Sequence, residues 1–305
     1  MLAAFVLAVV SVFGVNPTTV RYATIDGRDM MMDVYLPADT ATAREAVIFA
    51  FGGAFIGGER NNAEYLEYFN FLADNGVVAI SIDYRPTLKK NPQLLGSAEG
   101  IAEAFNNAVA DAVSDFLTAT SYVYFNAEDY GIDHNKIFAS GSSAGAITAL
   151  QAEYALCNGV RPPVLPETFN YAGVMSFAGA IFTRGPLTWT VAPCPMQLYH
   201  GDNDHNVPYG TLSWGPINFC GSASIASTLD EAKVPCEFFT FAGVDHRVAH
   251  SPMHDNLYDI LGFIKRVGAG KERLSIKAME SLPGAPVTHP TKITIEDIIK
   301  ANLNL

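Results

Sequence analysis

The stretch "FASGSSAGAITAL", residues 138–150, places two serines among small residues, between an apolar run and a run that favours a helix. Gly141, Ser143 and Gly145 form the pattern G-x-S-x-G. A serine hydroxyl becomes a nucleophile only where a base lies within hydrogen-bond reach and a sharp turn exposes it. On a strand-to-helix turn, glycines two residues to either side avoid collisions with the flanking elements. We therefore predict that Ser143 is a nucleophile on such a turn and that Ser142 is a small filler.

The rest of the chain supports this local context, because strand-like and helix-like segments alternate along it. Helical periodicity is found in residues 101–116, 144–156 and 256–267, and a strand-turn-strand pattern around Gly27 predicts an opening antiparallel hairpin. Short apolar runs typical of strands buried on both faces cover residues 46–53, 77–84, 136–143, 171–180, 195–202 and 236–243. This alternation predicts an α/β fold with a mostly parallel central sheet, helices on both faces and a ligand crevice at the carboxyl ends of the strands.

The chain divides into three predicted parts. Residues 1–15 are apolar and uncharged, too short to span a bilayer comfortably, and we interpret them as a secretory signal peptide; a buried N-terminal segment is the alternative. Residues 16–269 form the predicted catalytic domain. Residues 270–305 form a C-terminal extension with an amphipathic helix at 294–303, which we expect to be a packing or partner helix, because the sheet needs nothing after residue 269.

Composition restricts the kinds of partner. The chain has 305 residues, of which 49% are hydrophobic and 16% charged, so it can bury a sizeable core. A net charge of −12 without a block of Lys or Arg disfavours nucleic acid and anionic lipid. We expect a small-molecule or glycan-linked ligand, no membrane association after processing, and a secreted or periplasmic location. Oligomeric state is not predicted.

The four cysteines do not have the C-x-x-C spacing of a zinc or redox motif. If the protein is exported, disulfides can form, and the predicted layout places Cys157, Cys194 and Cys236 near the same end of the sheet, with Cys220 starting a helix at the other end. We favour Cys157 with Cys194. Buried free thiols are the equally weighted alternative.

The glycine-rich segment "FGGAFIGG", residues 51–58, follows the first long buried strand. Attack on a carbonyl creates an oxyanion, and fixed N–H donors to that oxygen stabilise it. We predict that the backbone amides of Gly53, Ala54 and Ala144 supply these donors. A simple glycine-rich loop is the alternative.

Two later loops offer an acid and a base. Asp204 lies in "YHGDNDHNVPY" after a buried strand and is predicted to orient a histidine, whereas Asp202 is expected to hold the turn. His246 lies in "FAGVDHRVAH" after the last buried strand and is the predicted general base. His200 and His205 are expected to be structural or exposed.

The spacing of His246, His250 and His254 raises a metal-binding alternative on one helix face. Ser251 and Pro252 disfavour it, because they are typical of the N-cap and first residue of a new helix, which would break a continuous face. We therefore predict no metal site and no cofactor.

The order of these motifs resembles that of the α/β-hydrolase fold, over residues 20–267. More narrowly, the sequence is similar to secreted bacterial lipases and esterases of the carboxylesterase and acetyl or feruloyl esterase group. In that group an H-G-G-G-F-like stretch, D-Y-R, G-x-S-A-G, H-G-x-x-D-x-x-V-P and G-x-x-H occur in this order. They correspond here to residues 51–55, 83–85, 141–145, 200–208 and 243–246. Phe51 stands where the group usually has histidine, which changes the support of the loop but not its backbone donors.

The resemblance implies a serine esterase that hydrolyses short or aromatic acyl esters, including acetyl or feruloyl groups on plant polysaccharides. Asp83 and Arg85 are expected to be structural by the same resemblance. No large cap or lid domain is expected, and Trp214 and Phe219 in the loop 209–219 either line an acyl or aromatic pocket or pack that loop down. The alternatives are a peptidase of the prolyl-peptidase type, a lipase acting on longer chains, and a catalytically silent binding protein.

Overall fold

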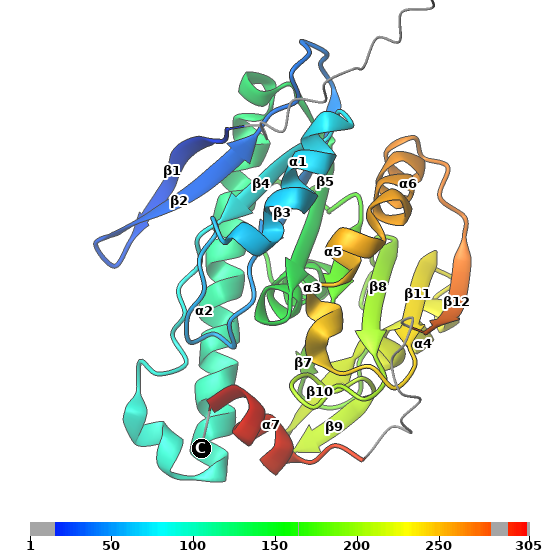
Figure 1. Ribbon diagram of the computed structural model, residues 1–305. Coiled ribbons are helices and arrows are strands. Elements are labelled where there is room, and N and C mark those ends of the chain that lie inside the picture. Colours follow the sequence, from blue (N-terminus) through cyan, green and yellow to red (C-terminus); the bar gives the residue numbers. More distant parts are fainter. Residues whose placement is uncertain (1–15, 164, 282–291, 304–305) are drawn as a thin grey trace, which may run out of the picture.

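The computed structural model describes residues 16–163, 165–281 and 292–303 (Figure 1). The predicted signal peptide, residues 1–15, lies outside the described residues.

A nine-stranded sheet forms the centre of the molecule (Figure 1). Its strands are β1 (Thr18–Ile25), β2 (Arg28–Tyr35), β3 (Arg44–Ala50), β4 (Val78–Ile82), β5 (Ile132–Ser142), β6 (Val174–Phe177), β8 (Met196–Gly201), β11 (Cys236–Phe241) and β12 (Ser275–Glu280). Their spatial order is β1-β2-β4-β3-β5-β6-β8-β11-β12. The β1–β2 and β2–β4 pairs are antiparallel and every other pair is parallel, which confirms the opening hairpin and the mostly parallel sheet.

Helices cover both faces of the sheet, as predicted. They are α1 (Leu66–Asp74), α2 (Ala98–Phe125), α3 (Ala144–Cys157), α4 (Ser222–Glu231), α5 (Pro252–Asp255), α6 (Leu257–Gly268) and α7 (Ile295–Leu303). In Figure 1, α1 and α6 lie in front of the sheet, whereas α2 and α3 lie behind it. No helix among the described residues has both the length and the apolar character required to cross a membrane.

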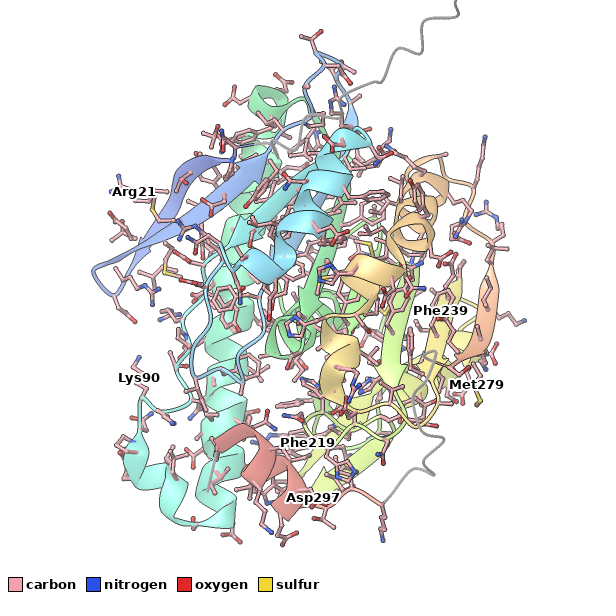
Figure 2. All side chains as sticks on the ribbon, viewed as in Figure 1. Arg21, Lys90, Phe219, Phe239, Met279 and Asp297 are labelled. Atoms are coloured by element: carbon pink, nitrogen blue, oxygen red, sulfur yellow. The ribbon has the colours of Figure 1, made fainter. Side chains whose placement is uncertain are left out.

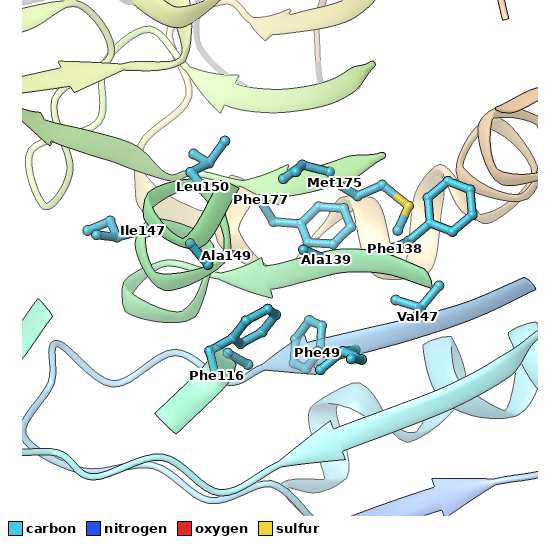
Figure 3. Close-up of a cluster of buried hydrophobic side chains, with 14 of the residues drawn as sticks. Val47, Phe49, Phe116, Phe138, Ala139, Ile147, Ala149, Leu150, Met175 and Phe177 are labelled. Carbon is cyan, nitrogen blue, oxygen red and sulfur yellow. The ribbon is translucent and has the colours of Figure 1, made fainter. Parts of the chain in front are cut away.

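A cluster of buried hydrophobic side chains lies where β3, β5 and β6 run side by side (Figure 3). Phe49, Phe138 and Phe177, one from each of these strands, have no exposed surface, and Phe116 of α2 is equally buried. Burying a phenylalanine side chain stabilises the fold by about 2–3 kcal/mol. This packing fixes the positions of the strands whose carboxyl ends carry the site.

The prediction that the sheet needs nothing after residue 269 is wrong. Strand β12 pairs in parallel with β11 from Cys236↔Ser275 to Phe241↔Glu280 and forms the edge of the sheet. Its side chains alternate between exposed and half-buried, so the segment lacks the apolar run that marked the other parallel strands.

The prediction of a loop at residues 209–219 is also wrong. Most of this segment forms two strands of a second, three-stranded antiparallel sheet. Its strands are β7 (Ala180–Thr183), β9 (Thr211–Trp214) and β10 (Ile217–Gly221), in the order β7-β10-β9. Trp214 pairs with Ile217, so Gly215 and Pro216 form a two-residue hairpin turn.

All four cysteines are buried free thiols, so the favoured Cys157–Cys194 disulfide is not formed. The Cys157 thiol donates to Glu153 Oε1 at 3.3 Å, and the Cys194 amide donates to the same oxygen at 2.8 Å. Cys220 lies in β10 rather than at the start of a helix, because α4 begins at Ser222.

The D-Y-R residues are structural, as expected. The carboxylate of Asp83 accepts from the Met31 amide and from Arg60, which ties the end of β4 to β2. Arg85 donates through Nε to Asp115 Oδ2 at 3.0 Å, and Nη2 lies 2.9 Å from Oδ1. Because the Asp115 side chain has no exposed surface, this pair joins the end of β4 to α2 inside the protein.

We predict that Asp115→Ala lowers the free energy of unfolding by about 3–5 kcal/mol, because Arg85 would lose its buried counter-charge. Asp26→Ala is the matched control: its carboxylate also contacts Arg85, but it is 66% exposed, so the loss should stay below about 1 kcal/mol. Urea unfolding of both variants measures the difference, and equal losses would contradict the assignment.

Candidate functional site

Ser143 occupies a sharp turn between β5 and α3. Its backbone has φ 52° and ψ −117°, a positive-φ conformation that a non-glycine residue adopts rarely. A Cβ on Gly145 would lie 2.0 Å from the Ala50 carbonyl oxygen, and a Cβ on Gly141 would lie 2.3 Å from Gly145. The two glycines of G-x-S-x-G are therefore required by backbone packing around the serine.

Ser143, His246 and Asp204 form one line of hydrogen bonds. His246 Nδ1 lies 2.7 Å from Asp204 Oδ2, and His246 Nε2 lies 2.8 Å from Ser143 Oγ. A carboxylate only accepts, so Nδ1 carries the proton and Nε2 is left to accept from the serine hydroxyl. The three residues follow β5, β8 and β11, whose parallel directions bring their carboxyl ends to one edge of the sheet.

The Asp204 carboxylate is buried but well supplied with donors. Its Oδ1 accepts from the amides of Asn206 at 2.8 Å and Val207 at 3.0 Å. Burial alone would raise the pKa of Asp204, but the charge of His246 and the hydrogen bonds from His200 and His246 outweigh it, so the pKa lies well below its usual range. Asp204 therefore stays ionised while it faces the imidazole.

His200 has a role in this site that sequence reasoning missed. It is fully buried, with Nε2 at 3.2 Å from the Val207 carbonyl and 3.3 Å from Asp204 Oδ2. Its Nδ1 lies 2.8 Å from Ser222 Oγ. Since the Val207 carbonyl only accepts, Nε2 is the donor, and the same N–H points at the Asp204 carboxylate.

Ser142 is more than the small filler that we predicted. It is completely buried, and its hydroxyl donates to the Ala249 carbonyl at 2.8 Å. Ala249 ends the 3-10 turn His246–Ala249. The residue before Ser143 therefore anchors the turn that carries the imidazole.

The glycine-rich loop after β3 brings Ala54 to the cavity beside Ser143. Ala54 and Ala144 both line the cavity beside Ser143, whereas Gly53 is exposed and does not line it. Ala54 has φ 53°, and the Gly53 carbonyl accepts from the Ile56 and Gly57 amides, which closes the loop into a tight turn. The Ala144 amide belongs to the first turn of α3, where amides have no partner within the helix.

Phe51, in place of the histidine of the related group, supports this loop by stacking. Its ring centroid lies 4.4 Å from that of Tyr84 at an interplanar angle of 24°. The Tyr84 hydroxyl donates to the Phe51 carbonyl at 2.9 Å.

A small cavity lies beside the serine. The volume in which the centre of a water molecule fits is only about 20 Å³. Trp214 and Phe219 were predicted either to line a pocket or to pack the loop 209–219 down, and Phe219 borders this cavity. Trp214 borders a separate pocket beside Arg184 and stacks on Phe219 with centroids 6.1 Å apart. The lining residues are Ala54, Phe55, Phe105, Ser143, Ala144, Ile147, Phe182, Asn206, Val207, Pro208, Phe219, Ile298 and Asn302.

Nine of the thirteen lining residues were not predicted as site residues, and four of these nine come from elements away from the sequence motifs. Phe105 comes from α2, Phe182 from β7, and Ile298 and Asn302 from α7. The amphipathic pattern of residues 294–303 predicted a packing or partner helix. The pattern of one helix does not identify the surface that the helix contacts.

The three regularly spaced histidines have separate partners. His254 Nδ1 lies 2.6 Å from Glu67 and His250 Nδ1 lies 3.5 Å from Glu64, while His246 faces Asp204. A new helix begins at Pro252, as the sequence predicted, but the Ser251 side chain before it makes no capping hydrogen bond. Across the part of the chain that the structure describes, no group of three or more His, Cys, Asp or Glu side chains is arranged to hold a metal ion.

The sheet, the strand-turn-helix around Ser143 and the order of the candidate site residues define the α/β-hydrolase fold. Comparison with solved structures agrees: the apo form of Thermogutta terrifontis esterase 2 superposes with a TM-score of 0.61 at 23% identity, over 84% of this chain and 96% of the esterase. The chain thus has the α/β-hydrolase fold, which confirms the predicted fold class.

Sequence comparisons narrow the similarity to esterases. The BD-FAE family model matches residues 32–96 and 101–159. The probable isoprenylcysteine alpha-carbonyl methylesterase ICME of Oryza sativa subsp. japonica is 24% identical over 254 residues, which are 70% of this chain and 54% of the relative. The probable methylesterase ICMEL1 of the same plant is 30% identical over 218 residues, 58% of this chain and 47% of the relative. The chain spans about half the length of these curated relatives.

The close approach at the serine turn gives a stability prediction. Gly145→Ala places a methyl group against the Ala50 carbonyl, so we expect the free energy of unfolding to fall by about 3 kcal/mol or more. Gly57→Ala is the control, because a Cβ there meets nothing within 4 Å. Urea unfolding of the two variants checks this, and a Gly145→Ala protein as stable as Gly57→Ala would contradict it.

Proposed function

We propose that the protein is a serine carboxylic ester hydrolase that cleaves esters of short acyl groups, carried by small molecules or glycans. The observation that carries this proposal is the line from Ser143 Oγ through His246 to Asp204, with distances of 2.8 and 2.7 Å. The esterase names of the relatives and of the similar solved structures support it.

In the proposed mechanism Ser143 Oγ attacks the ester carbonyl carbon while His246 Nε2 takes the hydroxyl proton. The amides of Ala54 and Ala144 stabilise the oxyanion, with Gly53 as the further predicted donor. The carbon–oxygen bond to the alcohol then breaks, and the proton on His246 goes to the leaving oxygen. Water attacks the acyl-enzyme by the same route and releases the carboxylic acid and free Ser143.

Asp204 has two tasks in this mechanism. It holds the Nδ1–H tautomer of His246, so that Nε2 faces Ser143, and it stabilises the imidazolium that forms during attack. A carboxylate with a lowered pKa suits both tasks, because it remains charged while it faces the imidazole.

Acyl groups of acetyl size fit the cavity beside Ser143 better than a feruloyl group, because only about 20 Å³ is open there. Export is a further proposal. It rests on the apolar, uncharged sequence of residues 1–15, and the net charge of −12 agrees with a neutral ester rather than a nucleic acid.

Ser143→Ala should lower kcat for p-nitrophenyl acetate by about 10⁴- to 10⁶-fold, and Asp204→Asn by about 10⁴-fold, because the wrong histidine tautomer would face the serine. A fluorophosphonate should label wild-type Ser143 stoichiometrically. Matched acetate and acetanilide substrates separate an esterase from a peptidase: we expect hydrolysis of the ester alone.

Asp202→Asn is the control for Asp204→Asn. Asp202 Oδ1 accepts from the Gly243 amide at 2.6 Å, and asparagine keeps an acceptor at this position, so activity should stay within about tenfold of the wild type. A fully active Ser143→Ala protein would refute the proposal.

A further inference from the structure

Helix α7 contributes Ile298 and Asn302 to the wall of the cavity beside the serine. Ile298 is only 2% exposed and Leu303 4%, so the helix is docked rather than lying free on the surface. Figure 1 places α7, in red, next to α2 and the small sheet, and Figure 2 labels Asp297 on α7 near Phe219 of β10. Ile298 and Phe219 line the same cavity as Ser143.

The helix is also bonded to the loop that holds the acid. Asn302 Nδ2 donates to the Asn206 carbonyl at 2.9 Å, and the Asn206 amide donates to Asp204 Oδ1 at 2.8 Å. The N-terminus of α7 is capped by its own segment of the chain. The Asp297 carboxylate accepts from the Thr294 amide, and the Asp297 amide donates to Thr294 Oγ1. Helix α7 therefore forms one wall of the cavity and is hydrogen-bonded to the loop that carries Asp204.

The wall leaves little room. A water molecule needs about 10–15 Å³ measured in the same way, so 20 Å³ corresponds to roughly one small group beyond the serine. The opposite walls are apolar side chains, Phe105, Ile147, Phe182 and Phe219. The Phe182 and Phe219 rings are themselves in contact, with centroids 4.2 Å apart.

We infer that α7 sets the acyl specificity of this hydrolase, with Ile298 as the residue that limits the acyl group to about the size of acetyl. The inference rests on the proposed esterase function. The cavity takes the acyl side because Ala54 and Ala144 border it together with Ser143. An acyl carbon bonded to Ser143 Oγ, with its oxygen toward those two amides, has its remaining substituent in this space.

The test compares p-nitrophenyl acetate, butyrate and hexanoate, which share one leaving group. A methylene that a pocket cannot accept changes kcat/KM by about 10-fold or more, so wild-type enzyme should prefer acetate to butyrate by at least that factor. Ile298→Ala removes the side chain that lines the cavity, and the butyrate-to-acetate ratio of kcat/KM should rise about tenfold. Ile298→Val should give a smaller rise in the same direction.

Ile299→Ala is the matched control. Ile299 is the next residue of α7 and is partly buried against the core, but it does not line the cavity. The same truncation there should leave the butyrate-to-acetate ratio unchanged, and melting temperatures of both variants show that α7 remains docked. Ethyl and phenyl acetate vary the alcohol instead, and their ratio should stay the same in Ile298→Ala.

Two outcomes would overturn the inference: an unchanged acyl ratio in both Ile298 variants, or a changed alcohol ratio, which would place the cavity on the leaving-group side. In either case acetate hydrolysis that depends on Ser143 would leave the proposed function intact. Absence of both ester turnover and fluorophosphonate labelling in the wild type would instead refute the proposed function.

Discussion

The site depends on one close backbone contact, where the start of α3 meets the end of β3. Gly145 approaches the Ala50 carbonyl so closely that a Cβ would lie 2.0 Å from the oxygen. This contact allows the chain to leave β5, hold Ser143 at φ 52° and turn directly into a helix. Because the buried aromatic residues of β3, β5 and β6 hold these strands in register, the strained serine conformation is imposed by the surrounding structure. The same turn places Ser143 and Ala144 on the wall of one cavity.

Further hydrogen bonds hold the Asp204 carboxylate and the His246 imidazole in place. A buried carboxylate is costly unless charges and donors surround it. Asp204 has two backbone amides on one oxygen and two imidazole nitrogens near the other. Ser142 adds a direct link between the serine turn and the turn that bears His246. The position of the imidazole therefore depends on contacts from β5 and from the acid loop, as well as on its own segment.

Much of this arrangement could be predicted from the sequence, because its determinants are local. Buried parallel strands appear as apolar runs, and each site residue comes within a few positions of the end of such a run. The failures have physical reasons of their own. Strand β12 has no buried face, so its pairing with β11 depends on a contact across the fold and leaves no apolar run. Strands β9 and β10 carry an alternating pattern around Gly215 and Pro216, which indicates a hairpin, but we interpreted the glycine and proline as a loop.

Local sequence therefore predicts the candidate reacting residues of the site better than it predicts the residues that shape the cavity. The reacting groups come from segments next to the central strands, where local sequence and position in the sheet are tightly coupled. The walls of the cavity come from α2, β7, β10 and α7, which are distant in sequence and meet only because the fold brings them together. No short sequence motif predicts that these four elements lie around one cavity. In the proposed function, acyl preference can therefore change through peripheral residues such as Phe182 or Ile298 without disturbing the glycine contact at Ser143, and only the assembled structure reveals which residues line the cavity.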